Sequence, residues 1–201
     1  EGYARSTGRV GVVLVTSGPG MSNTVTGLLD AHSDAIPVLC ISGQVATGVI
    51  GTQAFQECDA IGLSRPVTKW NHQLRDASEA AAAVRQALHI AASGKPGPVL
   101  LDVPKDVQLQ RVTHAPMTDT PASVSAPALP PASALQQAAA LLLAARQPVL
   151  YGGGGLINAG PGACAAFTQL ARRLHLPTTL TLMGLGAFPA SDPRFLGMLG
   201  M

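Results

Sequence analysis

The sequence predicts an α/β fold with a doubly wound, mainly parallel sheet, because short apolar segments alternate with helical patterns and glycine-rich turns. The clearest segment, Val10–Asn23, begins as an unbroken apolar run rich in β-branched residues. A run without polar alternation is typical of a strand buried on both faces. Ser17–Gly20 then predicts a tight turn into a helix N-terminus, where free N–H groups can face a polar ligand. The turn alone leaves a ligand-free reading equally open.

The other elements of the first half follow in order. We expect helices at residues 1–8, 23–31 and 80–91, and strands at 10–16, 37–42, 67–71 and 98–103. Gly8 stops the first helix. Asp76 and Glu79 form a capping-box pattern before the third helix, and Gly94 with Pro96 stops it. Residues 54–57 are expected to be a short helix or loop near the carboxyl ends of the strands.

Residues 111–133 change character, being rich in Pro, Ala, Ser and Thr with little periodicity. This composition predicts a linker at 111–132, which separates a first domain at 1–110 from the start of a second α/β domain at 133–201. In the second domain, Ser133 is expected to cap a helix with Leu135, Ala139 and Leu142 on one side. Strands at 149–151 and 177–182 then flank a helix entered near Pro161.

Composition narrows the functional classes. The 201 residues are 12% charged with a formal net charge of +2, which disfavours nucleic acid as a partner. No apolar run reaches the length of a membrane span. The 3 cysteines and 5 histidines lack metal-like spacing, so we expect no metal site, no disulfide framework and a cytoplasmic location. Because the sequence starts within a helical pattern at Glu1, we expect a fragment.

The residues alone give few candidate sites. Gly152–Gly155 follows a strand but does not match GxGxxG, so a plain turn is favoured over a nucleotide phosphate contact. Lys105 follows a buried strand, where α/β sheets bind ligands, although a solvated lysine is the commoner case. From the sequence alone, Phe55 could be an ordinary core aromatic and Gln56 an exposed helix residue, so neither is marked as a site residue. These patterns indicate an α/β protein that binds a phosphorylated cofactor.

Nine segments, in order along nearly the whole chain, add a family resemblance. They are GYARSTG, VGVVLVTSGPG with Asn23, ISGQV, AFQECD, SRPVTKW, SGKPGPVLLDVPKDV, YGGGG, LMGLGAFP and MLGM. Together they resemble the large catalytic subunits of acetohydroxyacid synthases (acetolactate synthases), which are thiamine-diphosphate enzymes. Residues 1–110 resemble the pyrimidine-binding domain, truncated at its N-terminus, and residues from 133 resemble the start of the central FAD-binding domain.

The resemblance implies a reaction. Enzymes of this family decarboxylate pyruvate and condense the product with a second 2-keto acid, giving acetolactate or acetohydroxybutyrate for branched-chain amino acid biosynthesis. Their cofactors are thiamine diphosphate, FAD and Mg²⁺. The activating glutamate and the magnesium ligands would lie outside this chain, so we expect these residues alone to be inactive. The parent would be a homodimer, with or without a small regulatory subunit.

The resemblance also assigns residues. Pro19 and Asn23 would contact the aminopyrimidine end of thiamine diphosphate. Gln56 would be an active-site amide that adds no charge, Phe55 part of an apolar wall and Lys105 a cation in the substrate channel. The residues placed along FAD would be Gly153, Gly154, Gly155, Thr181, Leu182, Met183, Leu199, Gly200 and Met201. Lys95 stands where the family usually has Arg, which leaves a flavin contact there open.

Two alternatives remain at this point. One is a sister thiamine-diphosphate enzyme, such as a glyoxylate carboligase or a pyruvate oxidase. The segments AFQECD and PKD favour the synthase over these relatives. The other is a non-catalytic flavin- or nucleotide-binding module.

Overall fold

The computed structural model describes residues 1–113 and 129–199, and the chain divides into two compact units, Glu1–Ala126 and Pro127–Met201. Both units contain parallel sheets with helices packed on them, so the predicted α/β class is confirmed. The predicted linker lies largely outside the described residues. No helix in the described part of the chain combines the length and apolar character needed to cross a membrane.

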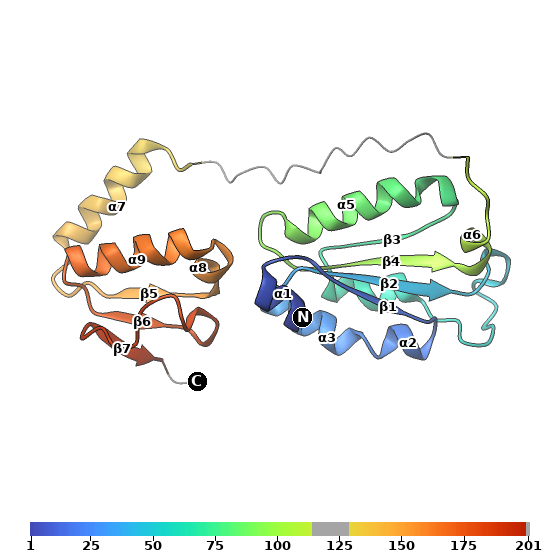
Figure 1. The fold of residues 1–201 in the computed structure, drawn as a ribbon, viewed down its shortest axis with the longest axis horizontal. Coiled ribbons are helices and arrows are strands. Elements are labelled where there is room, and N and C mark those ends of the chain that lie inside the picture. The colour runs from blue at the N-terminus through green and yellow to red at the C-terminus, as the bar shows by residue number, and fades with distance from the viewer. Residues whose placement is uncertain (114–128, 200–201) are drawn as a thin grey trace. The chain divides into compact units, whose positions relative to one another are not determined.

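Unit 1 is built on four parallel strands in the order β1-β2-β4-β3 (Figure 1). The strands are β1 Gly11–Val15, β2 Val38–Gln44, β3 Trp70–Gln73 and β4 Pro98–Pro104. The α-helices are α1 Gly2–Thr7, α2 Pro19–Ser22, α3 Val25–Ser33, α4 Ala60–Ser64, α5 Ala80–Ala92 and α6 Lys105–Gln108, and the 3₁₀ turns are η1 Thr47–Val49, η2 Arg65–Val67 and η3 Ala77–Glu79.

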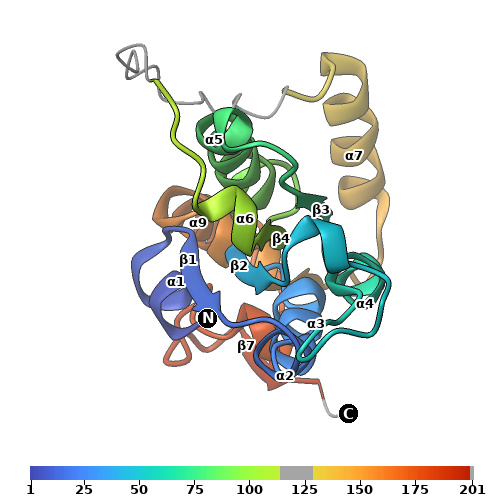
Figure 2. The same cartoon turned by 90° about the vertical axis from the view of Figure 1, so that its right-hand side faces the viewer.

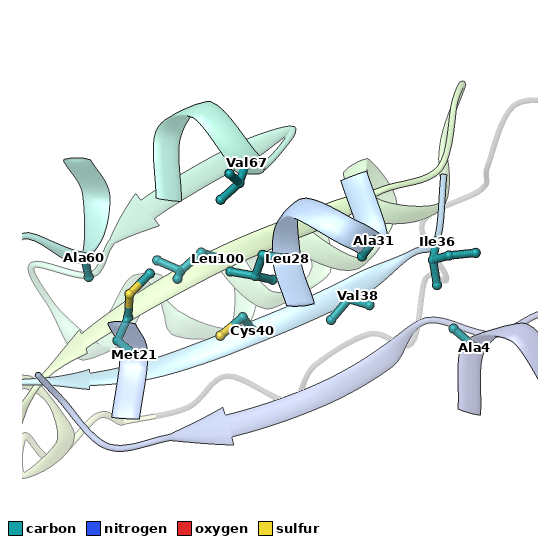
Figure 3. Close-up of a cluster of buried hydrophobic side chains, with 10 residues drawn as sticks. All are labelled: Ala4, Met21, Leu28, Ala31, Ile36, Val38, Cys40, Ala60, Val67 and Leu100. Carbon is teal, nitrogen blue, oxygen red and sulfur yellow. The ribbon is translucent and has the colours of Figure 1, made fainter. Parts of the chain in front are cut away.

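Helices cover both faces of this sheet, as a doubly wound fold requires. Figure 2 shows α5 on one side of the strands and α2 and α3 on the other. Successive residues of β4 point to opposite faces, as strand geometry dictates. Leu100 therefore packs with Met21 and Leu28 (Figure 3), whereas Val99 and Leu101 pack against α5. The central strands β2 and β4 are buried on both faces.

The prediction that the first strand is also buried on both faces is wrong. In unit 1, β1 is an edge strand, and among the described residues it pairs only with β2. Val12 is 60% and Leu14 is 75% exposed. An apolar run without alternation indicates the chemistry of a strand but not whether a neighbour covers it.

Smaller differences concern element boundaries. The helix expected at 23–31 is α3, which begins at Val25 and ends at Ser33, and a separate short helix, α2, precedes it. The third strand begins at Trp70 rather than at Val67, since η2 occupies Arg65–Val67. The segment 54–57 is a loop rather than a helix.

The predicted capping box is present at the start of η3, the 3₁₀ turn that leads directly into α5. The Asp76 side chain accepts a hydrogen bond from the Ser78 N–H at 2.8 Å, and Glu79 accepts one from the Asp76 N–H at 3.1 Å. At the other end, Lys69 Nζ donates to the carbonyl oxygens of Ser93, at 2.6 Å, and Ile90. Side chains therefore satisfy backbone groups at the start of η3 and at the end of α5.

Unit 2 has three parallel strands in the order β5-β6-β7, consistent with the start of a second doubly wound domain. Its core joins Ala171, Leu180, Ala187 and Phe188. The elements are α7 Ala132–Ala144, β5 Leu150–Gly152, α8 Gly154–Asn158, α9 Pro161–Arg173, β6 Thr178–Leu180, the 3₁₀ turn η4 Leu182–Gly184 and β7 Phe195–Met198.

Three expectations for unit 2 need correction. Pro131, not Ser133, occupies the N-cap position of α7, with no side-chain cap. Every residue of α7 is exposed except the half-buried Leu142, so the apolar side of this helix is not part of the core. Helix α8 and strand β7 were not predicted, because a glycine run and a glycine inside a short strand both weaken the periodic signal.

Candidate functional site

A cavity of about 680 Å³ lies at the carboxyl ends of β1, β2 and β4. Its lining combines apolar residues with two amides, hydroxyls and one cation: Leu14, Val15, Thr16, Ser17, Ile41, Ser42, Gly43, Gln44, Val103, Lys105 and Gln108. Open α/β sheets bind their ligands at this edge, and the volume falls in the range of small-molecule sites. We call it the carboxyl-edge cavity.

The glycine turn after β1 forms one wall of this region. Gly18 has φ +59°, a left-handed conformation that glycine adopts without strain, and Pro19 is the first residue of α2. A β-carbon at Gly20 would lie 2.7 Å from Thr16 Cγ2, so the turn also needs the absence of a side chain there. The predicted tight turn is confirmed.

The Gln56 backbone packs directly on this turn. A β-carbon at Gly18 would lie 2.7 Å from the Gln56 carbonyl oxygen, although the two residues are far apart in sequence. Gln56 itself has φ +61°. Phe55, next to it, is 89% exposed and does not line the cavity. The structure therefore brings Gln56 to the turn and leaves the aromatic ring in solvent.

The carboxylates of Glu57 and Asp106 stabilise nearby loops by accepting hydrogen bonds from backbone N–H groups. Glu57 accepts hydrogen bonds from the backbone N–H groups of Gly51 and, at 3.0 Å, Ala54. The Gly51 N–H is the main reason that the pKa of Glu57 lies below its ordinary value. Asp106 likewise accepts from the backbone N–H of Thr47, at 3.0 Å, and from its hydroxyl. The loop conformations depend on these ionised side chains.

A buried carboxyl lies behind the cavity. Asp102, in β4, is 0% exposed, and its Oδ2 accepts from Gln73 Nε2 at 2.7 Å and from Gln44 Nε2 at 3.2 Å. Burial raises the pKa of Asp102, and the two amide donors oppose this rise. Sequence reasoning missed this residue, although an acidic residue inside the apolar segment 98–103 was a visible signal.

The structure separates some predicted residues. Lys105 lines the carboxyl-edge cavity, whereas the exposed Asn23 lines a second cavity, of about 480 Å³, between α3 and β1. Pro19 is exposed at the start of α2. Lys95 is exposed after the end of α5. Lys105 and Asn23 therefore line different cavities.

In unit 2, the glycine run meets the loop after β6. A β-carbon at Gly184 would lie 2.6 Å from the Gly152 carbonyl oxygen, and one at Gly154 would lie 3.1 Å from Met183 Cβ. Thr181 Oγ1 accepts a hydrogen bond from the Gly184 N–H at 3.0 Å and fixes this loop. Backbone packing therefore accounts for part of the glycine run by itself.

The remaining predicted flavin residues are open to solvent. Leu182 is 56% and Leu199 is 54% exposed, and nothing lies within 4 Å of a β-carbon built at Gly155. Thr181 and Gly153 are half-buried beside each other. Gly200 and Met201 lie outside the described residues. Among the residues that the structure describes, no group of three or more His, Cys, Asp or Glu side chains could hold a metal ion.

Comparisons with known proteins agree with this arrangement of units. Residues 1–63 match the family model of the thiamine pyrophosphate enzyme N-terminal TPP-binding domain, and residues 135–201 match that of the central domain. Pro19, Asn23, Phe55 and Gln56 fall within the first match.

Curated relatives are similar over the whole chain. The acetolactate synthase large subunit of Haemophilus influenzae is 45% identical over 100% of this chain, and the acetolactate synthase isozyme 3 large subunit of Escherichia coli is 46% identical over 100%. The mitochondrial acetolactate synthase catalytic subunit of Saccharomyces cerevisiae is 44% identical over 100%. The chain covers 35%, 35% and 30% of these proteins, respectively, and thus spans about a third of their length.

Proposed function

Because the chain belongs to the thiamine pyrophosphate enzyme family, we propose that it is part of a thiamine-diphosphate-dependent acetolactate synthase. The whole protein would decarboxylate pyruvate and join the product to a second 2-keto acid, giving acetolactate or acetohydroxybutyrate. The observation that carries this proposal is the 44–46% identity, over the full chain, to acetolactate synthase catalytic subunits from two bacteria and a yeast.

The geometry of unit 1 fits a cofactor half-site. Thiamine diphosphate, when bound, supplies the nucleophilic carbon on which a 2-keto acid is decarboxylated. The turn at Gly18 lets backbone approach a ring closely, and we assign Pro19 and Asn23 to the aminopyrimidine end of the cofactor. Gln56, held on this turn, offers an amide that can donate and accept hydrogen bonds without adding charge.

Two further side chains act on the substrate in this proposal. Lys105, on the carboxyl-edge cavity, attracts the carboxylate of an incoming 2-keto acid. Phe55 presents an exposed ring, and when another part of the protein covers it, this ring excludes water from the reacting carboxylate. Both roles bind or orient substrate and require no proton transfer by these residues.

We assign FAD to unit 2. The bare backbone at Gly153, Gly154 and Gly155 allows close approach, and the exposed Leu182 and Leu199 offer apolar contacts beside Thr181 and Met183. Gly200 and Met201 belong to the same assignment by family resemblance. We assign the Mg²⁺ ligands to parts of the protein outside this chain, as the family resemblance implies.

The assembly and location are also proposals. The relatives' names include the term large subunit, which suits a catalytic homodimer with or without a small regulatory subunit. Cys40, Cys58 and Cys164 are free thiols, which suits the reducing cytoplasm.

The test uses the full-length protein. Purified enzyme supplied with pyruvate, thiamine diphosphate, Mg²⁺ and FAD should form acetolactate, and omitting thiamine diphosphate or Mg²⁺ should abolish it. Adding 2-ketobutyrate should give acetohydroxybutyrate. A protein that carboligates glyoxylate but not pyruvate would be a sister enzyme, and a yellow protein with no carboligase activity would be a flavin-binding module; either result would overturn the proposal.

A further inference from the structure

Hydrogen bonds connect a buried carboxyl in the middle of the unit 1 sheet to the loop that carries Cys58 and Gln56. The carboxyl belongs to Asp102, whose register partners are Ser42 on β2 and Gln73 on β4's other neighbour, β3. Asp102 is fully buried, does not line the carboxyl-edge cavity, and its second oxygen, Oδ1, makes no hydrogen bond within the described residues. Burying a carboxyl oxygen without a hydrogen-bond partner lowers the stability of the fold. Its presence therefore calls for an explanation.

The next group in this connection is the carboxamide of Gln44, which is held at both ends. Its Nε2 donates to Asp102 Oδ2 at 3.2 Å and to the Cys58 carbonyl oxygen at 2.8 Å. Its Oε1 accepts from the Val45 N–H at 2.9 Å. With each end satisfied, the amide has one orientation, and Asp102 is the acceptor that fixes the position of its nitrogen.

Cys58 links the Gln44 carboxamide to the region of the glycine turn. Burial raises the pKa of the Cys58 thiol, and the nearby Gly18 backbone opposes this rise. Two residues earlier, the Gln56 backbone packs on Gly18. Displacing the Cys58 carbonyl would therefore move both the loop that bears Gln56 and the turn on which it rests.

We propose that Asp102 and Gln44 form a positioning pair that holds Cys58, and through it the Gln56 loop, against the Gly18 turn. Neither residue needs to touch a reacting atom for this role. The inference deepens the proposed function, because it matters for catalysis only if Gln56 and the turn receive thiamine diphosphate. Its structural part, the anchoring of the loop, stands independently of the reaction.

Gln73 provides a matched control. Its Nε2 donates to the same oxygen, Asp102 Oδ2, at 2.7 Å, but within the described part of the chain its side chain makes no hydrogen bond to the Cys58 loop. Gln73→Met and Gln44→Met each remove one donor to the same buried carboxyl and replace it with an apolar chain of similar length. If the network serves only stability, the two variants should behave alike.

The experiment measures amide hydrogen exchange and thiamine-diphosphate dependence in the full-length protein. Gln44→Met and Asp102→Leu should speed exchange in residues 51–59 and raise the thiamine diphosphate concentration for half-maximal activity about tenfold, the effect of losing one hydrogen bond. Asp102→Asn keeps an acceptor oxygen and should restore both readouts. Gln73→Met should change neither readout, although it lowers the melting temperature.

The outcomes separate the possibilities. Equal effects of Gln44→Met and Gln73→Met on loop exchange, or no effect of Gln44→Met, would overturn the proposal. If Asp102→Leu fails to fold, the contrast between the two glutamine variants decides alone. If the wild-type protein has no thiamine-dependent activity, the proposed function falls, while the exchange measurements still decide whether the pair anchors the loop.

Discussion

Gly18 and Gln56 are in contact through their backbones: a β-carbon at Gly18 would lie 2.7 Å from the Gln56 carbonyl oxygen and 3.0 Å from its Cα. Glycine is therefore required at position 18 for two reasons. Its φ is +59°, and the Gln56 backbone leaves no room for a β-carbon. This contact brings the motif around Gly18 and the motif around Gln56 together.

Replacing Gly18 tests that contact. We expect Gly18→Ala to destabilise the protein by about 1–3 kcal/mol, from the strained φ and the clash, and to weaken thiamine diphosphate binding. Gly27→Ala is the control, because Gly27 lies in helix α3 with nothing within 4 Å of a new β-carbon. It should stabilise the protein by about 1 kcal/mol. Urea unfolding measures both variants, and similar destabilisation by the two would contradict the role given to Gly18.

The sequence predicted most of the sheet, for physical reasons visible in particular elements. Unbroken apolar runs mark β2 and β4, because these strands are buried on both faces. The capping box at Asp76–Glu79 is local chemistry and was predicted in full. The edge position of β1 and the exposure of α7 depend on what packs against them, which no local pattern encodes.

The candidate site was predictable only in pieces. The turn at Gly18 and the position of Lys105 after β4 follow from local pattern. The contact between Gly18 and Gln56, and the network of Gln44, Gln73 and Asp102, join residues far apart in sequence. Such pairings depend on strand order and register, which a single sequence does not specify.

The pH dependence of the loop tests the role of Glu57. Its pKa is lowered from 4.5 in the folded protein by the Gly51 and Ala54 N–H groups, so the stabilisation of the loop is fully present above pH 4.5 and is lost as the pH falls through the lowered value. Hydrogen exchange in residues 50–57 should rise, relative to intrinsic rates, over this acid range. Glu57→Gln should show fast exchange already at neutral pH and no acid transition. An unchanged loop in Glu57→Gln would contradict this role.

Substitutions at two glycines of unit 2, Gly184 and Gly155, distinguish an effect on packing from an effect on flavin binding. Gly184→Ala places a β-carbon 2.6 Å from the Gly152 carbonyl oxygen and should destabilise unit 2 by about 1–3 kcal/mol. A β-carbon at Gly155 meets nothing within 4 Å among the described residues, so we expect any loss of flavin in Gly155→Ala to come from a clash with the ligand itself. We expect Gly184→Ala to lose both stability and flavin absorbance, and Gly155→Ala to lose flavin absorbance alone. Full flavin occupancy in Gly155→Ala would remove Gly155 from the assigned site.

Asp192 gives unit 2 its own acid sensitivity. Its side chain is 3% exposed and accepts from the Arg194 N–H at 3.0 Å, from Arg194 Nη1 at 3.1 Å and from Arg172 Nε at 2.9 Å. These donors, with the Arg194 backbone N–H as the largest contribution, lower the pKa of Asp192 from 3.8 to about 2.

Because the folded pKa of Asp192 lies below the unfolded value, its stabilisation of unit 2 is complete above pH 3.8 and is lost as the pH falls through about 2. Asp192→Asn should therefore increase amide exchange in β6 and β7 at pH 7, and its difference from the wild-type protein should shrink as the pH falls from 3.8 through about 2. Arg173→Ala, at an exposed position of α9, should match the wild-type protein at both pH values. A difference between Asp192→Asn and the wild-type protein that stays equally large from pH 7 to pH 2 would show that Asp192 acts through packing rather than through its charge.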